Sequence, residues 1–136
     1  MSGSNMPLLQ ASKQSKLIAW VIAAPIFAFL LLAGGTKVAG ANPLAQLPAM
    51  EPYVFWVGLG ELTGAILFLL PRTSIIGAFF LSAHLGGAIL FHIIRAENFF
   101  GPILTSFWFQ SSMLASVWLV VVLRYPAILH NFEPRR

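Results

Sequence analysis

The sequence predicts an all-α integral membrane four-helix bundle with both termini in the cytoplasm, and two observations lead to this fold class. Of the 136 residues, 58% are hydrophobic and only 9% are charged, whereas an average soluble domain has roughly 25% charged residues. The apolar residues also gather in four runs of 18 to 21 residues. As a helix that rises about 1.5 Å per residue, such a run crosses the roughly 30 Å hydrocarbon core of a bilayer.

Four transmembrane helices are expected at about 17–34, 53–70, 74–94 and 103–123. They form one domain, 17–124, between a flexible cytoplasmic tail, 1–16, and an interfacial cytoplasmic tail, 125–136. A soluble bundle is disfavoured because so short a chain has too little polar surface to cover four apolar helices. A cleaved signal peptide is disfavoured because the first run is long and no clear small-x-small cleavage site follows it.

The basic residues predict the orientation. Four crossings place both termini and the turn between the second and third helices on one side of the membrane. Six basic residues lie on that side and two on the other, and the positive-inside rule assigns the richer side to the cytoplasm. Since these residues are scattered among helix ends, membrane lipids are expected partners and nucleic acid is not. The six are Lys13, Lys16, Arg72, Arg124, Arg135 and Arg136, and the two are Lys37 and Arg95.

Glu61 and His84 are the candidate proton-handling pair, because each stands inside an apolar run. The short turn Pro71-Arg72-Thr73 forces the second and third helices into an antiparallel hairpin. Both residues lie about 16 Å from this turn, near the middle of the membrane, so they are expected to face each other. An ionisable group at this depth is costly and marks a functional site by default. The alternative is that the pair only staples the hairpin.

Structural roles are predicted for residues around this pair. Gly60 and Gly64 have the spacing that lets transmembrane helices approach closely, and Gly87 is expected to act in the same way on the third helix. Pro71 and Arg72 shape the turn. On the fourth helix, Gln110 and Ser111 are candidate ligand-binding residues, with interhelical hydrogen bonding as the alternative role.

No metal site is expected. His84 and His92 lie about 12 Å apart along one helix and some 80° around it, so they cannot hold one metal ion. No other predicted membrane helix carries a histidine, which disfavours a haem held within one chain. The absence of cysteine excludes thiolate metal sites and disulfides. His92 and Lys37 are expected at the solvated outer interface.

Four short motifs resemble the DoxX-like family of small four-helix membrane proteins, over about 17–123. They are Ala33-Gly34-Gly35-Thr36-Lys37, Gly60-Glu61-Leu62-Thr63-Gly64-Ala65, Leu70-Pro71-Arg72-Thr73, and Gly77-Ala78 followed by Gly87-Ala88-Ile89. The resemblance implies a bacterial cytoplasmic membrane, and some DoxX and DoxD relatives are associated with quinone-linked sulfur oxidation or membrane redox complexes. It singles out Lys37, Glu61 and Arg72, which makes Lys37 a further ligand-binding candidate. His84 is not part of the pattern, so its pairing with Glu61 rests on geometry.

The leading interpretation is a non-autonomous subunit of a membrane redox system that binds a quinone or a similar lipophilic ligand. Glu61 would accept or relay a proton, and His84 would donate a hydrogen bond or share that proton. The alternatives are an oligomeric small-molecule or proton-coupled transporter and a structural or assembly protein. A redox partner subunit and a homo-oligomer are the candidate protein partners. Independent catalysis is not expected, because the chain has no nucleotide-binding loop, soluble-cofactor motif or nucleophile-base arrangement.

Overall fold

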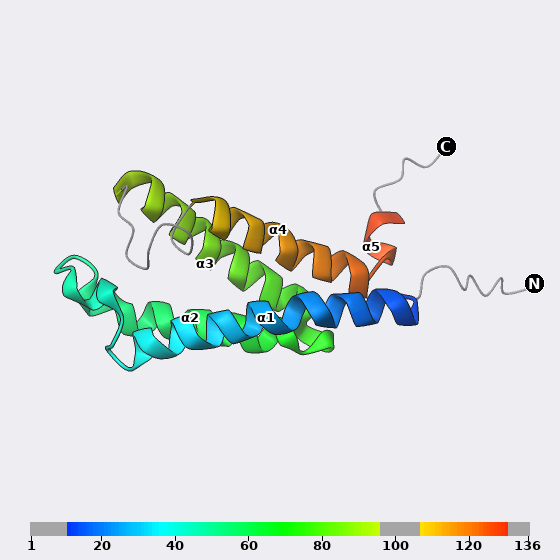
Figure 1. The fold of residues 1–136 in the computed structure, drawn as a ribbon, viewed down its shortest axis with the longest axis horizontal. Coiled ribbons are helices and arrows are strands. Elements are labelled where there is room, and N and C mark those ends of the chain that lie inside the picture. Colours follow the sequence, from blue (N-terminus) through cyan, green and yellow to red (C-terminus); the bar gives the residue numbers. More distant parts are fainter. Residues whose placement is uncertain (1–10, 96–106, 131–136) are drawn as a thin grey trace, which may run out of the picture.

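Four long antiparallel helices form the molecule (Figure 1). The computed structural model describes residues 11–95 and 107–130, and within these ranges the chain is helical and contains no strand. The long helices are α1 (Lys13–Val38), α2 (Glu51–Leu69), α3 (Ser74–Arg95) and α4 (Phe107–Arg124), and the short ones are η2 (Pro43–Gln46), η3 (Pro71–Thr73) and α5 (Ala127–His130). Four segments are long and apolar enough to cross a membrane. The end of the bundle that holds η3 is called the turn end, and the end that holds η2 the loop end.

The start of α1 lies earlier than the sequence predicted. The Ser12 hydroxyl accepts a hydrogen bond from the Ser15 backbone N–H at 3.0 Å, and this cap starts the helix at Lys13. Residues 13–16 are therefore helical, and the expectation of a flexible tail is wrong for this part of the chain. Residues 1–10 lie outside the described ranges.

The end of α1 lies four residues later than the sequence predicted, at Val38. A Cβ at Gly34 would lie 3.1 Å from the carbonyl oxygen of Gly58, so the two helices touch here almost backbone to backbone. Such contact offsets the low helix propensity of glycine. The continuation keeps Lys37 on the helix instead of in a loop.

The other helix bounds differ less from the predicted ones. α2 and α3 begin and end within two residues of the expected positions. The predicted start of the fourth helix, 103–106, lies outside the described residues, and α4 is described from Phe107 to Arg124. In the predicted interfacial tail, the short helix α5 follows Pro126, and the residues after 130 are not described.

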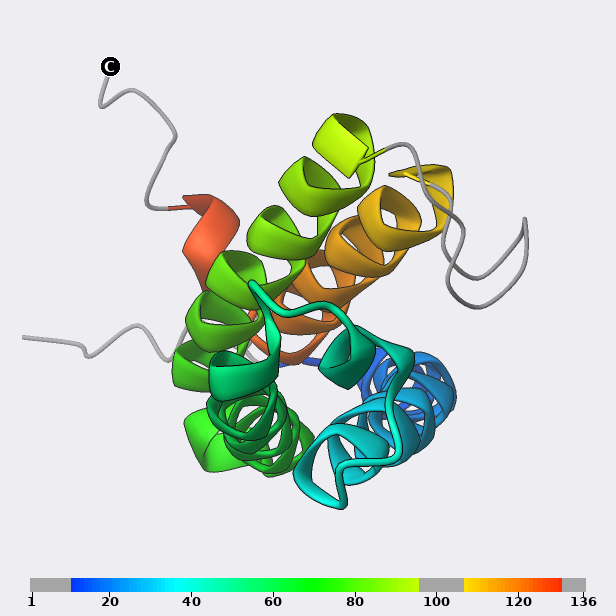
Figure 2. The same cartoon turned by 90° about the vertical axis from the view of Figure 1, so that its left-hand side faces the viewer.

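The two helix pairs α1/α2 and α3/α4 converge at the turn end and separate toward the loop end (Figures 1 and 2). Near the turn end, a Cβ at Gly77 of α3 would lie 2.5 Å from the Cα of Phe68 in α2. Farther along, the places of a Cβ at Gly60 and Gly87 are open, with no described atom within 4 Å. The close crossing at one end and the separation at the other leave room for a cavity.

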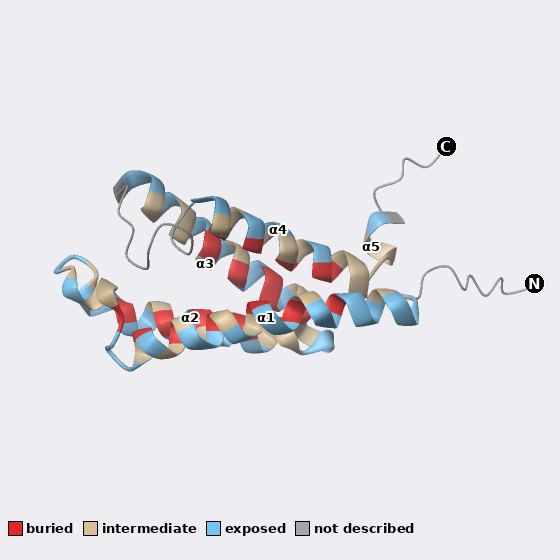
Figure 3. Cartoon of the chain, in the orientation of Figure 1, coloured by how far each residue is buried: buried red, intermediate tan, exposed pale blue. Residues whose placement is uncertain are grey.

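The outward faces of the helices carry large apolar side chains, and the buried residues face the interior (Figure 3). Trp56 is 66% exposed and Ile94 70%. The buried core is apolar and small, with Phe68 and Leu81 among its largest fully buried side chains. A surface this apolar fits a hydrocarbon surrounding better than water.

Arg124, the last residue of α4, ties the turn end together. Its Nη1 donates to the carbonyl oxygen of Phe68 at 2.6 Å and its Nη2 to that of Leu69 at 3.3 Å. These carbonyls belong to the last turn of α2, where oxygens have no partner within the helix. The guanidinium also lies 5.1 Å from the centroid of the Trp20 ring of α1. The hydroxyl of Tyr125 donates to the carbonyl oxygen of Pro71. One cation therefore connects three helices.

Replacing Arg124 with methionine is expected to lower the free energy of unfolding by about 1.5 to 3 kcal/mol, the usual worth of hydrogen bonds to a charged group. The measurement is the SDS fraction that unfolds the purified protein in mixed micelles. Arg72→Met removes an exposed cation at the same end and should shift this midpoint little. Equal shifts for the two variants would mean that loss of charge, and not the tie to α2, is responsible.

Candidate functional site

Lys37 and Glu61 form a buried ion pair between α1 and α2. Lys37 Nζ lies 2.5 Å from Glu61 Oε2, and the two side chains are 9% and 3% exposed. Lys37 Nζ also donates to the carbonyl oxygen of Ala33 at 3.4 Å. Gly58 makes this arrangement fit, because a Cβ there would lie 2.6 Å from the Cβ of Lys37. The expectation that Lys37 is solvated at the outer interface is therefore wrong.

His84 completes a three-residue cluster with this pair. Its Nε2 lies 3.5 Å from Glu61 Oε1, so each carboxylate oxygen faces a different basic residue. The contact between Glu61 and His84 that the hairpin geometry predicted is present. The His84 side chain is 19% exposed, more than those of its two partners. Lys37 and Glu61 balance each other in charge, and His84 is the member that a ligand could reach first.

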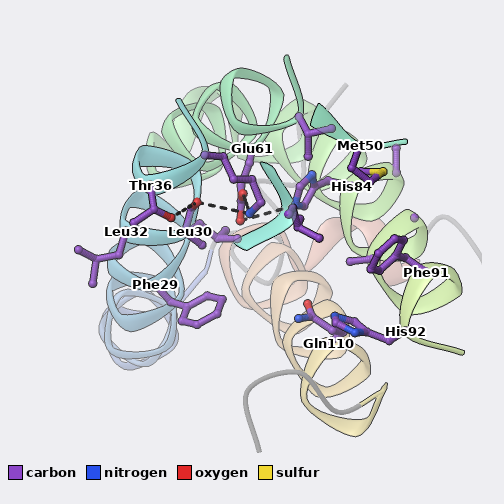
Figure 4. Close-up of a pocket in the computed structure, with 17 residues that line it drawn as sticks. Phe29, Leu30, Leu32, Thr36, Met50, Glu61, His84, Phe91, His92 and Gln110 are labelled. Atoms are coloured by element: carbon purple, nitrogen blue, oxygen red, sulfur yellow. Dashed lines mark hydrogen bonds and ion pairs between the residues drawn. The ribbon is translucent and has the colours of Figure 1, made fainter. Parts of the chain in front are cut away.

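A cavity of about 640 Å³ lies beside this cluster, between the two separating helix pairs (Figure 4). All four long helices contribute to its wall, and most of the lining is apolar. Proteins bind drug-sized ligands in pockets of about 300 to 1,000 Å³ that are largely apolar and hold a few polar groups. The cavity has the size and the character of such a site. Its polar lining residues are Thr36, Lys37, Glu61, His84, His92 and Gln110.

The connection between α1 and α2 contributes Leu44 and Met50 to the cavity wall at the loop end. Asn42 anchors this connection: its side chain donates to the Thr36 hydroxyl at 3.2 Å and accepts from the Leu44 backbone N–H at 3.1 Å. Asn42 is 2% exposed. Gly40, with φ of 70°, allows the chain to turn just before it. The connection is thus a fixed wall of the cavity.

A second polar group lines the cavity away from the ion pair. In Figure 4, Glu61 and His84 point toward one another on one side, and His92 and Gln110 lie on the other. His92 Nδ1 is buried and has no hydrogen-bond partner among the described residues. Buried polar atoms almost always have a partner, which can be protein, water or ligand. The expectation that His92 belongs to the solvated outer interface is wrong, because it faces this cavity.

The remaining predicted residues lie outside the polar cluster. Ser111 is half-buried on α4 and does not line the cavity. Pro71 and Arg72 form η3 at the turn end, far from the site. Gly64 lies at a close approach, where a Cβ would be 3.0 Å from Leu81 Cδ2. Gly60 and Gly87 do not lie at a close approach, and Gly87 lines the cavity instead.

The histidines and carboxylates within 11–95 and 107–130 do not gather into a group of three that could hold a metal ion. The cavity offers hydrogen-bonding groups and an internally balanced charge. Such a site favours an uncharged, mainly apolar molecule with a small polar head, since a charged ligand would meet no free counter-charge.

No family model, curated protein or solved structure matches this chain.

Proposed function

We propose that this protein is a membrane-embedded binding subunit for a quinone or a similar lipophilic ligand, and that it serves a redox partner in a bacterial cytoplasmic membrane with both termini in the cytoplasm. The observation that carries the proposal is the apolar cavity beside Lys37, Glu61 and His84. A quinone ring is apolar apart from its two carbonyl oxygens. These oxygens accept hydrogen bonds, and the imidazoles of His84 and His92 can donate them.

The charge arrangement supports a role in proton handling. Glu61 contacts both Lys37 and His84, so a proton that His84 gives to a reduced ligand oxygen could be replaced through Glu61. The chain has no cysteine and so holds no iron-sulfur cluster of its own, and we assign the supply of electrons to a partner. This is why we assign it a subunit role.

The family resemblance supports the same function. Two of the three residues that it singles out, Lys37 and Glu61, meet in the buried ion pair. The third, Arg72, lies at the turn end, where positive charge favours a cytoplasmic position. We therefore propose DoxX-like membership together with the redox role.

The test is binding of a short-chain ubiquinone to the purified protein in lipid nanodiscs, with empty nanodiscs of the same lipid as the baseline. Saturable binding of about one quinone per chain is expected. His84→Leu should weaken it about tenfold, since loss of one hydrogen bond costs about 1.4 kcal/mol. Ser116→Ala is the matched control, because Ser116 bonds to its own helix through the Ser112 carbonyl and is not part of the cavity wall. Quinone uptake no greater than that of empty nanodiscs would refute the ligand class.

The redox partner needs a separate measurement. Gentle extraction from the native membrane followed by mass spectrometry should recover an oxidoreductase subunit together with the protein. Recovery of a homo-oligomer alone would favour the second candidate function, a proton-coupled transporter. The observation behind that candidate is that three ionisable side chains meet inside the bundle, as they do in proton relays. Flux into proteoliposomes that stops in His84→Leu would then decide for transport.

A further inference from the structure

We propose that the cavity opens sideways into the hydrocarbon layer between α2 and α3, through a mouth formed by Ala83 and Gly87, and that its ligand enters from the lipid. This inference rests on the proposed function for the identity of the ligand. The evidence for the mouth comes from the packing of the helices, and the mouth can be tested without any quinone.

The first observation is the combination of exposure and lining at the mouth. Ala83 and Gly87 are one helical turn apart on the same face of α3. Both are exposed, and both line the cavity. They are the two exposed lining residues on α3; on α1, Leu32 and Thr36 combine exposure and lining in the same way. Because Ala83 has a methyl group and Gly87 has no side chain, neither obstructs the opening.

The second observation is the open surroundings of a glycine on each of the two helices at this level. A Cβ at Gly87 or at Gly60 of α2 would meet no described atom within 4 Å. Closer to the turn end, Gly64 and Gly77 leave no such room. The packing of α2 on α3 is thus tight below the mouth and looser beside it, where Glu61 and His84 still meet.

The third observation is the polar group directly behind the mouth. His84 follows Ala83, and its partly exposed side chain lies 3.5 Å from Glu61. A polar head that passes between α2 and α3 therefore meets the imidazole first and the ion pair next. The mouth leads to the polar cluster and not only to an apolar wall.

The depth of the mouth decides the source of the ligand. Gly87 lies eight residues before the end of α3 at Arg95, which is about 12 Å along the helix axis. The hydrocarbon core is about 30 Å thick, and α3 has 22 residues, enough to cross it. The mouth thus faces acyl chains, so only a molecule dissolved in the bilayer can use it.

The test uses the fact that the chain has no cysteine. Ala33→Cys places one thiol on the α1 wall of the cavity. In nanodiscs, a maleimide with a dodecyl chain is expected to modify this thiol, and a charged, membrane-impermeant methanethiosulfonate is not. Adding Gly87→Phe should slow the dodecyl maleimide at least tenfold, because the ring fills the mouth. Gly86→Phe is the matched control: Gly86 is equally open but does not line the cavity.

Two outcomes would overturn the mouth. Equal labelling rates in the Gly87→Phe and Gly86→Phe backgrounds would show that the reagent enters elsewhere, and fast reaction with the charged reagent would show an aqueous route. Both glycine variants must keep the unfolding midpoint of the parent, as their open surroundings predict. If labelling supports the mouth but no quinone binds, only the proposed ligand class is refuted. If quinone binds and the labelling rate is unaffected by Gly87→Phe, only the proposed mouth is refuted.

Discussion

Replacing Lys37 with methionine is expected to lower the free energy of unfolding by about 3 to 5 kcal/mol, because it leaves a buried carboxylate without its nearest counter-charge. The partner left behind is Glu61, which is only 2% exposed. The measurement is the SDS unfolding midpoint in mixed micelles. Lys13→Met serves as the control, since Lys13 is an exposed cation on the same helix and its loss should leave this midpoint nearly unchanged.

The double variant Lys37→Met/Glu61→Met separates the pair from its surroundings. Apolar residues of similar volume often replace a buried ion pair without loss of stability, so the double variant should recover most of the stability lost in Lys37→Met. Quinone binding should not recover, because Glu61 no longer orients His84. A double variant as unstable as the single one would mean that Lys37 stabilises the bundle through packing.

The second large effect is expected at the crossing of α2 and α3. Gly77→Ala should lower the free energy of unfolding by about 3 kcal/mol, the upper end of the usual range for overpacking, because the added Cβ meets backbone atoms of Phe68, among them the Cα at 2.5 Å. Backbone cannot rotate aside as a side chain can, so the helices must move apart. The same SDS unfolding midpoint measures the loss.

Gly86→Ala is the matched control for this substitution. It changes the same residue type in the same helix, but the place of its Cβ is open. Alanine is favoured over glycine inside a helix by roughly 0.5 to 1 kcal/mol, so the control should be neutral or stabilising. Equal losses in the two variants would contradict a specific contact between Gly77 and Phe68.

The helices were predictable from the sequence because run length decides whether a segment can cross a membrane. The contact between Glu61 and His84 was predictable too, since a short turn fixes the depth of both residues. The burial of Lys37 was not. Gly34 and Gly35 suggested a helix end, whereas the close contact of Gly34 with Gly58 lets the helix continue.

The cavity could not be predicted because it depends on the separation of the two helix pairs, which no local pattern encodes. His92 was assigned to the outer interface for this reason. Its place near the end of α3 indicated solvent, but the direction of α3 turns its ring to the cavity. Gly60, Gly64 and Gly87 were all expected to lie at close helix contacts. Their spacing alone, however, does not distinguish a glycine at a helix contact, such as Gly64, from one at an opening, such as Gly87.

The depth of the mouth at Gly87 also bears on competition from the lipids themselves. Phospholipids vastly outnumber any quinone, and their acyl chains could slip between α2 and α3. Their headgroups, however, stay at the water interface, because moving a phosphate about 12 Å into hydrocarbon is prohibitively costly. A phospholipid would thus bring no polar group to His84, whereas a molecule whose polar head resides among the acyl chains could bring one. The bilayer itself would sort the candidates before the protein contacts any of them.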